Sequence, residues 1–437
     1  MRGRSSGNTW TNWAGVESCS PRDLIRPRSR RELVETVAAG AGEGRQITVA
    51  GSGHSFTGAA LTGDLMLDLG SLGGLIEADH ASGRVKVGGG TVLADLNREL
   101  DRLGLAMPNL GDVDAQTIAG AISTGTHGTG ADLPNISAQV VGMDLVTADG
   151  RVRELSVEGT PDELRAARVA VGSLGVIATV TLQTVPAFNL HRIDRPMPLE
   201  EVLGDFDEFA EANQHFEFFV FPYTDKALTI RRNRTDLPLN PRGRIERYVS
   251  DVVIENGLGE LGLRYVGKVP RLIPKLARFS SVFMDQAERV DSSFKIFANY
   301  RTIRFNEMEY ALPREAGPEA VSRVLELIES ERFPMGMPIE CRTVAGDDAM
   351  LSPAYERATT YVAVHQHASM EWRPYFDAIE EIFKSYGGRP HWGKRNSRTA
   401  ADLAPDYPEW DRFQAVRNEF DPGRVFSNEY VTRVLGE

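Results

Sequence analysis

The sequence predicts an α+β protein of two domains, the second built on an antiparallel sheet that helices cover. The chain has 437 residues, which is more than one compact core usually serves, so two domains are expected. Short strand-like segments alternate with turns up to about residue 90, and two helix–strand alternations follow Arg301. A strand pattern over 176–185 is interrupted by Pro186, where we place the first domain boundary.

Capping residues and periodic apolar residues locate the elements of the first half. Ser29 and Glu32 form a capping-box pattern, so we expect a helix to begin near Arg30. The elements expected after it are an amphipathic helix with Leu93, Leu96, Leu100 and Leu103 on one face, a hairpin over 140–152 turning at Asp149-Gly150, a helix over 163–171 and a strand over 176–185.

The second half is expected to hold strands followed by helices with one apolar face. The segments are strands over 216–221 and 227–231, a helix over 318–330, an extended segment over 338–344, a strand over 361–367 and a helix over 372–386. Gly387 is the expected C-cap of that last helix. Helices packed on one side of such a sheet give an α+β domain.

Composition restricts the classes of function. The formal net charge is −12, which argues against a nucleic-acid partner but not against a phosphate-bearing cofactor. Cys19 and Cys341 are the two cysteines, too few for a disulfide framework or a four-cysteine zinc site. The basic stretch 1–7 is not followed by an apolar segment of signal-peptide length, and no run approaches the length of a membrane span. We therefore expect a cytoplasmic protein without an integral membrane segment.

The loop over residues 50–56 is the most informative motif. It reads Ala-Gly-Ser-Gly-His-Ser-Phe and follows the strand-like segment 46–49. Small residues at the end of a strand let backbone N–H groups approach a phosphate closely, and His54 can touch a cofactor from the same loop. Such a loop alone is weak support, because glycine-rich loops usually mark only tight turns.

Further motifs follow in a defined order. They are Val87-Gly88-Gly89-Gly90, Pro108-Asn109-Leu110-Gly111, the segment 118–130 with its Gly, Ser, Thr and His residues, and Gly172-Ser173-Leu174-Gly175-Val176-Ile177. In this order and spacing the motifs resemble the FAD domain of the vanillyl-alcohol-oxidase superfamily. Arg389-Pro390-His391-Trp392-Gly393-Lys394 and the segment 420–426 narrow the resemblance to the aldonolactone oxidase and alditol oxidase branch. It covers nearly the whole chain, from about Asn12 to Gly436.

The resemblance implies a two-domain FAD-binding fold of the vanillyl-alcohol-oxidase type. Residues 1–187 are then the FAD-binding domain, and residues 188–395 are the substrate (cap) domain. Residues 396–437 form a C-terminal segment that returns to the FAD domain. The FAD-contacting residues implied by the motifs are Ala50, Gly51, Ser52, Gly53, His54, Ser55, Gly111, Thr117, Gly120, Ala121, Ser123, Thr124, His127, Gly128, Ile177 and His391.

Two histidines of these motifs have more than one interpretation. In the resembled family, the histidine at the position of His54 bonds covalently to the 8α-methyl carbon of the flavin. The alternative is a loop histidine that only hydrogen-bonds a backbone carbonyl. His127 is either a flavin neighbour or a packed core histidine. A second link through cysteine is not expected, since neither cysteine lies in the segment 118–130.

Glu340 and Arg342 are the most informative pair of the second half. Residues two apart in an extended segment share a face, so the two side chains point the same way and Cys341 points into the core. Unaided, this pattern favours a salt bridge on a solvated sheet face. The resemblance makes both residues catalytic: Glu340 accepts hydrogen bonds from substrate hydroxyls, and Arg342 stabilises the anion formed on the reduced flavin.

The resemblance also implies roles for residues that follow and precede this strand. Lys394 is a catalytic and substrate-binding residue, against the alternative of a surface lysine whose stem packs on the protein. His365 is a substrate-binding residue. Together with His367 it could suggest a metal site, but two histidines without a carboxylate cluster are weak support, and none is expected. Asp112 replaces the small hydroxyl residue with which alditol oxidases touch the polyol. Glu309 and Tyr310 are left as candidates for a structural role.

The expected activity is that of a FAD-dependent oxidase of a sugar-derived alcohol. Asp112 and the segments 294–297 and 307–314 favour an aldono-1,4-lactone of the gulono, galactono or arabinono type, with hydride transfer to flavin N5. Reoxidation by O2 would give H2O2, because Gly111 matches the family position that leaves space for oxygen. The alternatives are an alditol oxidase of the xylitol or sorbitol type, an aldonolactone dehydrogenase with another acceptor, and a catalytically silent flavin- or sugar-binding protein.

Overall fold

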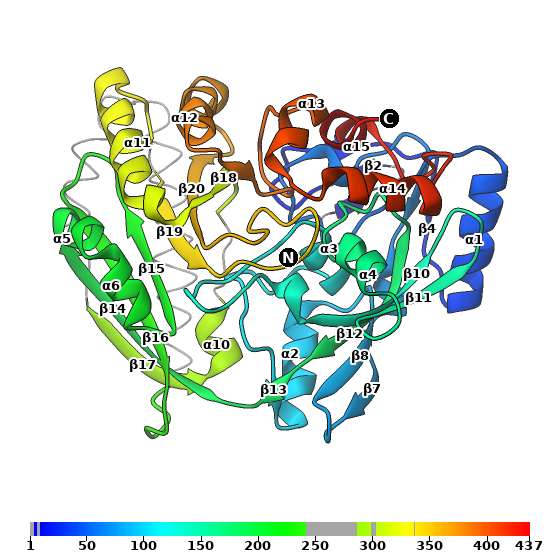
Figure 1. Ribbon diagram of the computed structural model, residues 1–437, viewed down its shortest axis with the longest axis horizontal. Coiled ribbons are helices and arrows are strands. Elements are labelled where there is room, and N and C mark those ends of the chain that lie inside the picture. The colour runs from blue at the N-terminus through cyan, green and yellow to red at the C-terminus, as the bar shows by residue number, and fades with distance from the viewer. Residues whose placement is uncertain (1–3, 7–8, 242–285, 299–302, 336) are drawn as a thin grey trace.

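The computed structural model describes residues 4–6, 9–241, 286–298, 303–335 and 337–437 (Figure 1). Most of the basic N-terminal stretch 1–7 therefore lies outside the described residues. The described residues contain both helices and strands, and their largest sheet is antiparallel, so the predicted α+β class is confirmed. No helix within the described ranges combines the length and the apolar character that crossing a bilayer requires.

The first half contains a five-stranded antiparallel sheet in the order β11-β10-β12-β8-β7. Its strands are β7 (Leu75–Asp79), β8 (Arg84–Gly88), β10 (Val140–Val146), β11 (Val152–Ser156) and β12 (Val176–Gln183). The predicted hairpin is β10–β11, and Gly150 has a φ of +74° at its turn. A small parallel sheet contains β4 (Asp23–Ile25), β5 (Ile47–Val49) and β6 (Leu65–Leu67).

Three helices of the first half form where capping and periodicity predict them or close by. They are α1 (Arg30–Gly42), α2 (Leu93–Arg102) and α4 (Pro161–Arg168). A short helix, α3 (Ile118–Ser123), forms in the motif segment 118–130. The Ser29 side chain caps α1 by accepting from the Glu32 N–H. The helix predicted over 163–171 ends at Arg168, because the chain leaves the helical conformation at Val169 and reaches a φ of +53° at Val171.

The second half is dominated by an eight-stranded sheet in the order β17-β14-β16-β15-β19-β20-β18-β21. Its strands are β14 (Asn189–Pro198), β15 (His215–Val220), β16 (Lys226–Arg234), β17 (Ala287–Ser292), β18 (Phe305–Pro313), β19 (Ile339–Val344), β20 (Thr359–His367) and β21 (Arg389–Pro390). All the hydrogen-bonded pairs recorded in this sheet are antiparallel.

One face of this sheet is apolar and covered by helices. The helices are α5 (Leu199–Gly204), α6 (Phe206–Glu211), α11 (Gly317–Glu331) and α12 (Arg373–Ser385), and Figure 1 shows α11 and α12 lying over the sheet. Phe218, Cys341, Val362 and Met308 come from four neighbouring strands and belong to the same buried cluster as the helix side chains. Cys341 therefore points into the core, as predicted.

The opposite face of the same strands carries charged residues. Strand register places Glu217 opposite Arg342 and Glu307 opposite His365. This face meets the first half through the segment after α3, where the Gly130 N–H donates to the Thr343 carbonyl at 2.8 Å. The His215 Nδ1 atom lies 2.8 Å from the Thr129 carbonyl oxygen in the same contact. Residues of the first half thus pack against part of the polar face of the sheet.

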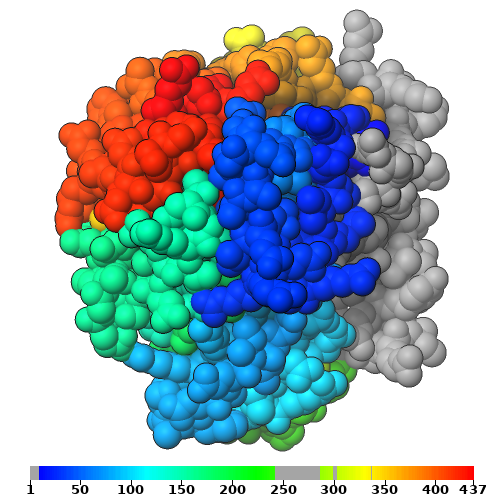
Figure 2. All heavy atoms as spheres, turned by 90° about the vertical axis from the view of Figure 1, so that its right-hand side faces the viewer, coloured from blue at the N-terminus to red at the C-terminus, as the bar shows by residue number. Residues whose placement is uncertain are grey.

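The C-terminal residues pack against the first half of the chain. They form α13 (Ala400–Leu403), α14 (Trp410–Phe420) and α15 (Glu429–Leu435), which share a buried cluster with residues of the segment 85–182. Asn428 fastens α15 by donating to the carbonyls of Gly58, Ala59 and Leu61. Figure 2 shows these C-terminal residues beside the N-terminal ones on one face of the molecule.

Candidate active site

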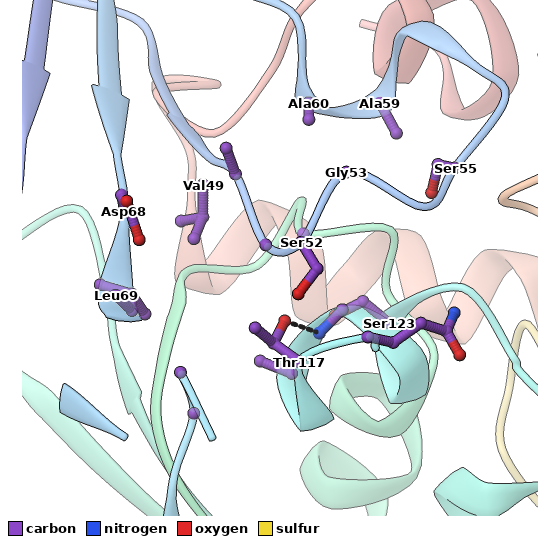
Figure 3. Close-up of a pocket in the computed structure, with 18 of the residues that line it drawn as sticks. Val49, Ser52, Gly53, Ser55, Ala59, Ala60, Asp68, Leu69, Thr117 and Ser123 are labelled. Carbon is purple, nitrogen blue, oxygen red and sulfur yellow. Dashed lines mark hydrogen bonds between the residues drawn. The ribbon is translucent and has the colours of Figure 1, made fainter. Parts of the chain in front are cut away.

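The loop 50–55 and the segment 117–124 line one side of a large cavity (Figure 3). The cavity encloses about 1390 Å³ outside protein atoms, its open mouth included. The 50–55 loop begins at the end of β5, and α3 begins at Ile118, so a strand end and a helix start face each other. The first N–H groups of α3 already donate within the protein, Ile118 to the Thr91 carbonyl and Ala119 to the Gly89 carbonyl. The backbone donors for a negatively charged group such as a phosphate would therefore come from the 50–55 loop.

Glycine at position 51 is required by the closeness of the two segments. A Cβ atom on Gly51 would lie 2.6 Å from the Thr117 Oγ1 atom. That oxygen caps α3 by accepting from the Gly120 N–H at 3.3 Å, a bond that Figure 3 marks. The Ser52 hydroxyl oxygen points between the two segments and is buried without a hydrogen-bond partner in the described structure. An unsatisfied buried hydroxyl beside bare backbone is what a cavity that binds a polar ligand offers.

A dinucleotide that carries phosphates fits this cavity by its size and donor set. Arg26 is the cation that lines it, and its Nε atom is 2.9 Å from the Asp68 carboxylate, which offsets its charge. Backbone N–H groups and hydroxyls, and not this arginine, would therefore stabilise the negative charge of a bound diphosphate. Ile177 lines the same cavity, with Gly175 and Val171 beside it.

A second cavity adjoins the first and encloses about 1480 Å³, its open mouth included. The two cavities share His54, Ser55, Gln116 and Thr124 in their walls. The second is lined by charged residues of the large sheet: Glu307 and Glu309 from β18, and Glu340 and Arg342 from β19. A ligand that fills the first cavity can therefore reach a chamber of buried charges.

Arg342 lies among three carboxylates. Its guanidinium contacts Glu340, lies 3.0 Å from Glu217 and lies 2.8 Å from Asp112. Glu217 is also bound by Arg232 at 2.6 Å. All these side chains are buried. Burial by itself would lower the pKa of Arg342, but the three carboxylates raise it well above its usual value, so the guanidinium stays charged.

Lys394 lies between two glutamates of one strand. Its Nζ atom contacts the Glu307 carboxylate and is 2.9 Å from the Glu309 carboxylate. Burial would lower the pKa of Lys394, but the two negative charges raise it. Burial would raise the pKa values of Glu307 and Glu309, yet the charge of Lys394 lowers both below their usual range. The three groups are therefore ionised together.

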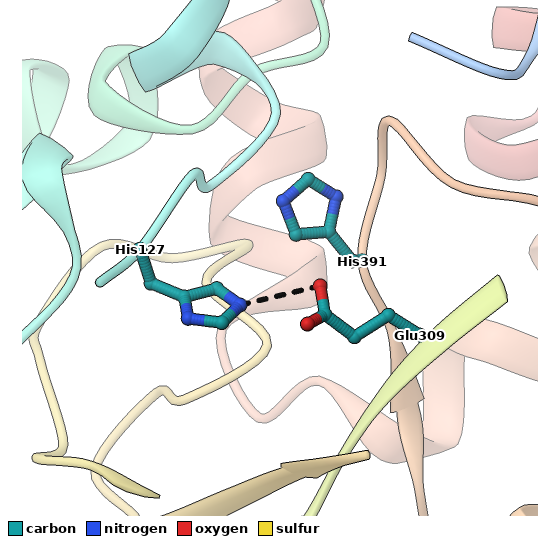
Figure 4. A group of neighbouring side chains, drawn as sticks. All are labelled: His127, Glu309 and His391. Carbon is teal, nitrogen blue, oxygen red and sulfur yellow. Dashed lines mark hydrogen bonds and ion pairs between the residues drawn. The ribbon is translucent and has the colours of Figure 1, made fainter. Parts of the chain in front are cut away.

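His127 and His391 flank Glu309 in the wall of the second cavity (Figure 4). The His127 Nε2 atom is 3.2 Å from the Glu309 carboxylate, and its ring stacks on Tyr361 with centroids 3.7 Å apart. Burial and then the charge of Lys394 lower the pKa of His391 to about 3, so it is neutral. The three side chains could in principle hold a metal ion. Because Glu309 is already paired with Lys394, we assign no metal here.

His54 lies where the two cavities meet. Its ring stacks on Trp13, with centroids 5.1 Å apart and planes 20° apart. This contact fixes the ring at the junction while leaving it part of both cavity walls. A covalent or polar contact to a ligand that passes from one cavity to the other is geometrically open to this side chain.

The structure brings most of the predicted site residues to the two cavities. The first is lined by Ala50, Gly51, Ser52, Gly53, His54, Ser55, Thr117, Gly120, Ser123, Thr124 and Ile177, and the second also by Gly111, Asp112, His127, Glu340, Arg342, His391 and Lys394. Ala121, Gly128 and His365 line neither cavity. Ala121 is in the core, and a Cβ atom on Gly128 would lie 2.3 Å from the Leu110 carbonyl oxygen. His365 lies behind Glu307, with 3.4 Å between His365 Nε2 and the carboxylate.

Several residues of the cavity or its charge network escaped the sequence interpretation, among them Glu307, Gln116, Glu217 and Glu309. Glu307, Glu309 and Gln116 line the second cavity, and Glu217 accepts a hydrogen bond from Arg342. Tyr310, next to Glu309 on the strand, points into the core instead and donates to Glu380. A signal for two of them exists, because Glu307 and Glu309 alternate with apolar Met308 and Tyr310. Nothing in the sequence pairs Glu217 with Arg342, since 125 positions separate them.

Comparison with protein families identifies both halves of the chain. The profile described as D-arabinono-1,4-lactone oxidase matches residues 180–434, and the profile described as FAD binding domain matches residues 21–156. The L-gulono-1,4-lactone dehydrogenase of Mycobacterium tuberculosis is 48% identical over 98% of this chain and 99% of that protein. The L-gulonolactone oxidase of Bos taurus is 33% identical over 98% of each chain.

A solved structure shows the same fold at low identity. The cholesterol oxidase from B. sterolicum superposes with a TM-score of 0.85 at 17% identity, covering 98% of this chain and 96% of that one. The fold is thus the FAD-binding fold of the vanillyl-alcohol-oxidase type that the motifs predicted, and the resemblance inferred from them is confirmed.

Proposed function

Because the chain belongs to the D-arabinono-1,4-lactone oxidase family of FAD-dependent enzymes, we propose that it oxidises an alcohol group of an aldono-1,4-lactone. The observation that carries the proposal is the junction of the two cavities. A cavity with the donor set for a dinucleotide opens at His54 into a chamber that holds Glu340, Arg342 and Lys394. In this arrangement a cofactor in the first cavity and a polyhydroxylated substrate in the second would meet at His54.

The residues of the first cavity would hold FAD. Gly51 and Gly53 leave the backbone accessible, and Ser52 and Thr117 supply hydroxyls beside it. When bound, FAD supplies the acceptor of the hydride from the substrate carbon. We propose that His54 bonds covalently to the flavin, which its position in both cavity walls supports.

The charged residues of the second cavity would bind the hydroxyl groups of the substrate. Glu340 and Asp112 accept hydrogen bonds from hydroxyls, and Lys394 donates to a substrate oxygen. Arg342, charged and held by three carboxylates, stabilises negative charge that develops nearby during the reaction. These roles make Glu340, Arg342 and Lys394 catalytic residues and Asp112 a substrate-binding residue. His365, which lies behind Glu307, would act on the substrate only through that carboxylate.

We propose molecular oxygen as the electron acceptor. Gly111 lines the second cavity and presents no side chain to it. The relatives carry both names, since one is an oxidase and the more similar of the two is a dehydrogenase. A dehydrogenase that uses another acceptor is therefore the alternative, and reoxidation in air decides between them.

We also propose a division of labour along the chain. Residues 1–187 would bind FAD, residues 188–395 would bind the substrate, and residues 396–437 would complete the FAD-binding part. The strands of the large sheet all lie within 189–390, and the C-terminal helices share a core with the first half, which supports this division. A cytoplasmic location, with Cys19 and Cys341 as thiols, completes the proposal.

Anaerobic mixing of the purified protein with a panel of sugars tests the function. Aldono-1,4-lactones should bleach the flavin absorbance, and alditols should do so more slowly. Glu340→Gln should slow the bleaching by lactones while the protein retains its flavin. Rapid reduction by alditols alone would make the protein an alditol oxidase. No reduction by any member of the panel would contradict the proposal.

A further inference from the structure

Two glutamates of β18 enclose the amine of Lys394. Glu307 and Glu309 are two residues apart on one strand, so both point to the polar face of the sheet. Lys394 Nζ contacts the first carboxylate and is 2.9 Å from the second. An ammonium group has three N–H donors, so two are used by the protein and one is left for the cavity that Lys394 lines.

Each glutamate lies beside a histidine. The His365 Nε2 atom is 3.4 Å from Glu307, and its Nδ1 atom is 2.8 Å from the Pro338 carbonyl oxygen. The His127 Nε2 atom is 3.2 Å from Glu309, and its Nδ1 atom is 2.8 Å from the Gly128 carbonyl oxygen. The His365 Nε2 atom has no hydrogen-bond partner among the described residues, so Glu309 is the carboxylate that a histidine contacts within hydrogen-bond distance.

We propose that Glu307 and Glu309 are positioning residues that keep Lys394 charged and direct its remaining N–H into the substrate cavity. The proposal rests on the function proposed above in one respect, namely that this N–H meets the substrate. Lysine has a long flexible side chain, and burying its charge without partners favours the neutral amine. Two carboxylates on one strand oppose both effects, because they restrict the position of the amine and favour its charged form.

The charge of the group supports this role. Burial acts to discharge Lys394, and the two carboxylates raise its pKa despite that burial. With one carboxylate replaced by an amide, the remaining pair would carry no net charge, and burial would favour proton transfer that leaves the amine neutral. A neutral amine is a weaker donor and a better nucleophile, so its chemical reactivity reports the change directly.

Trace acetylation of the folded holoenzyme measures that reactivity without turnover. Acetic anhydride reacts with free amines only, and peptide mass spectrometry gives the rate at Lys394 relative to exposed Lys226. Glu307→Gln and Glu309→Gln should each raise the relative rate at Lys394 about tenfold or more, since one pKa unit changes the free amine tenfold. Glu380→Gln is the matched control, because Glu380 is a buried carboxylate of α12 that bonds Tyr310 and Ser397 instead. Equal Lys394 rates in wild type and both glutamine variants would overturn the proposal.

A double-mutant cycle tests whether the glutamates act through Lys394. Glu309→Gln should lower kcat with the aldonolactone by roughly tenfold to a hundredfold, the scale of losing a directed donor. In a Lys394→Met background the same change should lower kcat no further. A further fall of similar size would show that Glu309 acts by another route and would contradict the proposal.

Two additional results separate the possible failures. If the two single glutamine variants do not fold, the variant Glu307→Gln/Glu309→Gln/Lys394→Met removes all three charges together and should fold with kcat near that of Lys394→Met. Partial activity above Lys394→Met in this variant would count against positioning. If wild type oxidises no lactone, the proposed function fails, whereas the acetylation rates still decide whether the glutamates control Lys394.

Discussion

Asp112 and Arg342 form a buried ion pair, with 2.8 Å between the carboxylate Oδ2 and guanidinium Nη2 atoms. Asp112 follows Gly111 in a loop of the first half, and Arg342 is on strand β19 of the large sheet. The pair therefore joins the two halves of the chain at the wall of the substrate cavity. A small hydroxyl residue at position 112 would leave this contact unmade.

Replacing Asp112 should change the preference among substrates. Asp112→Ser removes a negative charge and the contact with Arg342, so the ratio of alditol to lactone oxidation should rise. Activity with the lactone should fall roughly tenfold to a hundredfold, because a charged hydrogen bond of about 1.5–3 kcal/mol is lost. Steady-state kcat/KM with a lactone and an alditol measures the ratio. An unchanged ratio would mean that Asp112 does not discriminate between them.

Removing Arg342 should reduce both rate and stability. Arg342→Ala should slow anaerobic flavin reduction about a hundredfold or more, as expected for a lost electrostatic contact in the transition state. It should also lower the free energy of unfolding by about 3–5 kcal/mol, because Asp112, Glu217 and Glu340 lose the cation among them. Arg342→Lys, measured by stopped flow and denaturant unfolding, should recover more stability than rate. A variant with normal reduction kinetics would exclude a catalytic role.

His54 should remain attached to flavin after denaturation. Acid-precipitated protein should stay yellow and show a mass increase equal to FAD. His54→Ala should bind FAD without the bond, because the rest of the first cavity is unchanged. Free flavin in the supernatant of the precipitated wild type would contradict the covalent link.

Gly111 should control reaction with oxygen. A Cβ atom at this position would lie 3.0 Å from the His127 carbonyl oxygen and 3.4 Å from Thr126 Cγ2, so Gly111→Ala needs a shift of a few tenths of an ångström. We expect the variant to slow reoxidation in air, with release of less H2O2, more than it slows reduction by lactone. Both half-reactions should be measured, because a shift of His127 alters reduction too. Slow reoxidation of wild type with fast turnover on a dye would identify a dehydrogenase.

Asp347 should make stability depend on pH between about 4 and 6. Burial raises its pKa from 3.8 to about 6, although Ser352 and the Ala349 N–H bond the carboxylate. A raised pKa in the folded state stabilises the fold below pH 3.8, and this contribution is lost as the pH rises through 6. The effect is at most about 3 kcal/mol. The negative charge of nearby Asp348 also raises the pKa of Asp347, and the positive charge of Arg168 lowers it.

Thermal unfolding at pH 5 and pH 7 measures this dependence. Asp347→Asn should lower the unfolding temperature at pH 5 relative to that at pH 7, compared with wild type, because the amide does not titrate. Asp348→Asn, which alters a largely exposed carboxylate beside it, should have a smaller effect than Asp347→Asn, because burial and not Asp348 is the main cause of the raised pKa. Glu307 and Glu309 have lowered pKa values, so their loss of stability lies at more acid pH. His215 and His391, whose pKa values burial lowers to about 4 and about 3, lower the stability at pH 5 in wild type and variant alike, so the comparison of the two proteins isolates Asp347.

Local patterns predicted the elements well. The cap at Ser29, the apolar face of Leu93, Leu96 and Leu100, and the alternation around Cys341 depend on residues within a few positions of one another. The same short-range signals located the loop 50–55 and the pair Glu340 and Arg342. Helix ends were less certain, as the early end of α4 at Arg168 shows, because they depend on what the following residues pack against.

The sequence by itself determined which residues could make a nucleotide loop and a catalytic strand, since glycine conformation and side-chain alternation are local properties. Only the tertiary structure decided their charges and partners. Glu217 and Asp112 meet Arg342 across distant segments, and Glu307 and Glu309 meet Lys394 across some 85 positions of chain. Electrostatic interaction depends on distance and burial in space, neither of which sequence separation records. For the same reason His365 lies behind Glu307, outside the cavity wall.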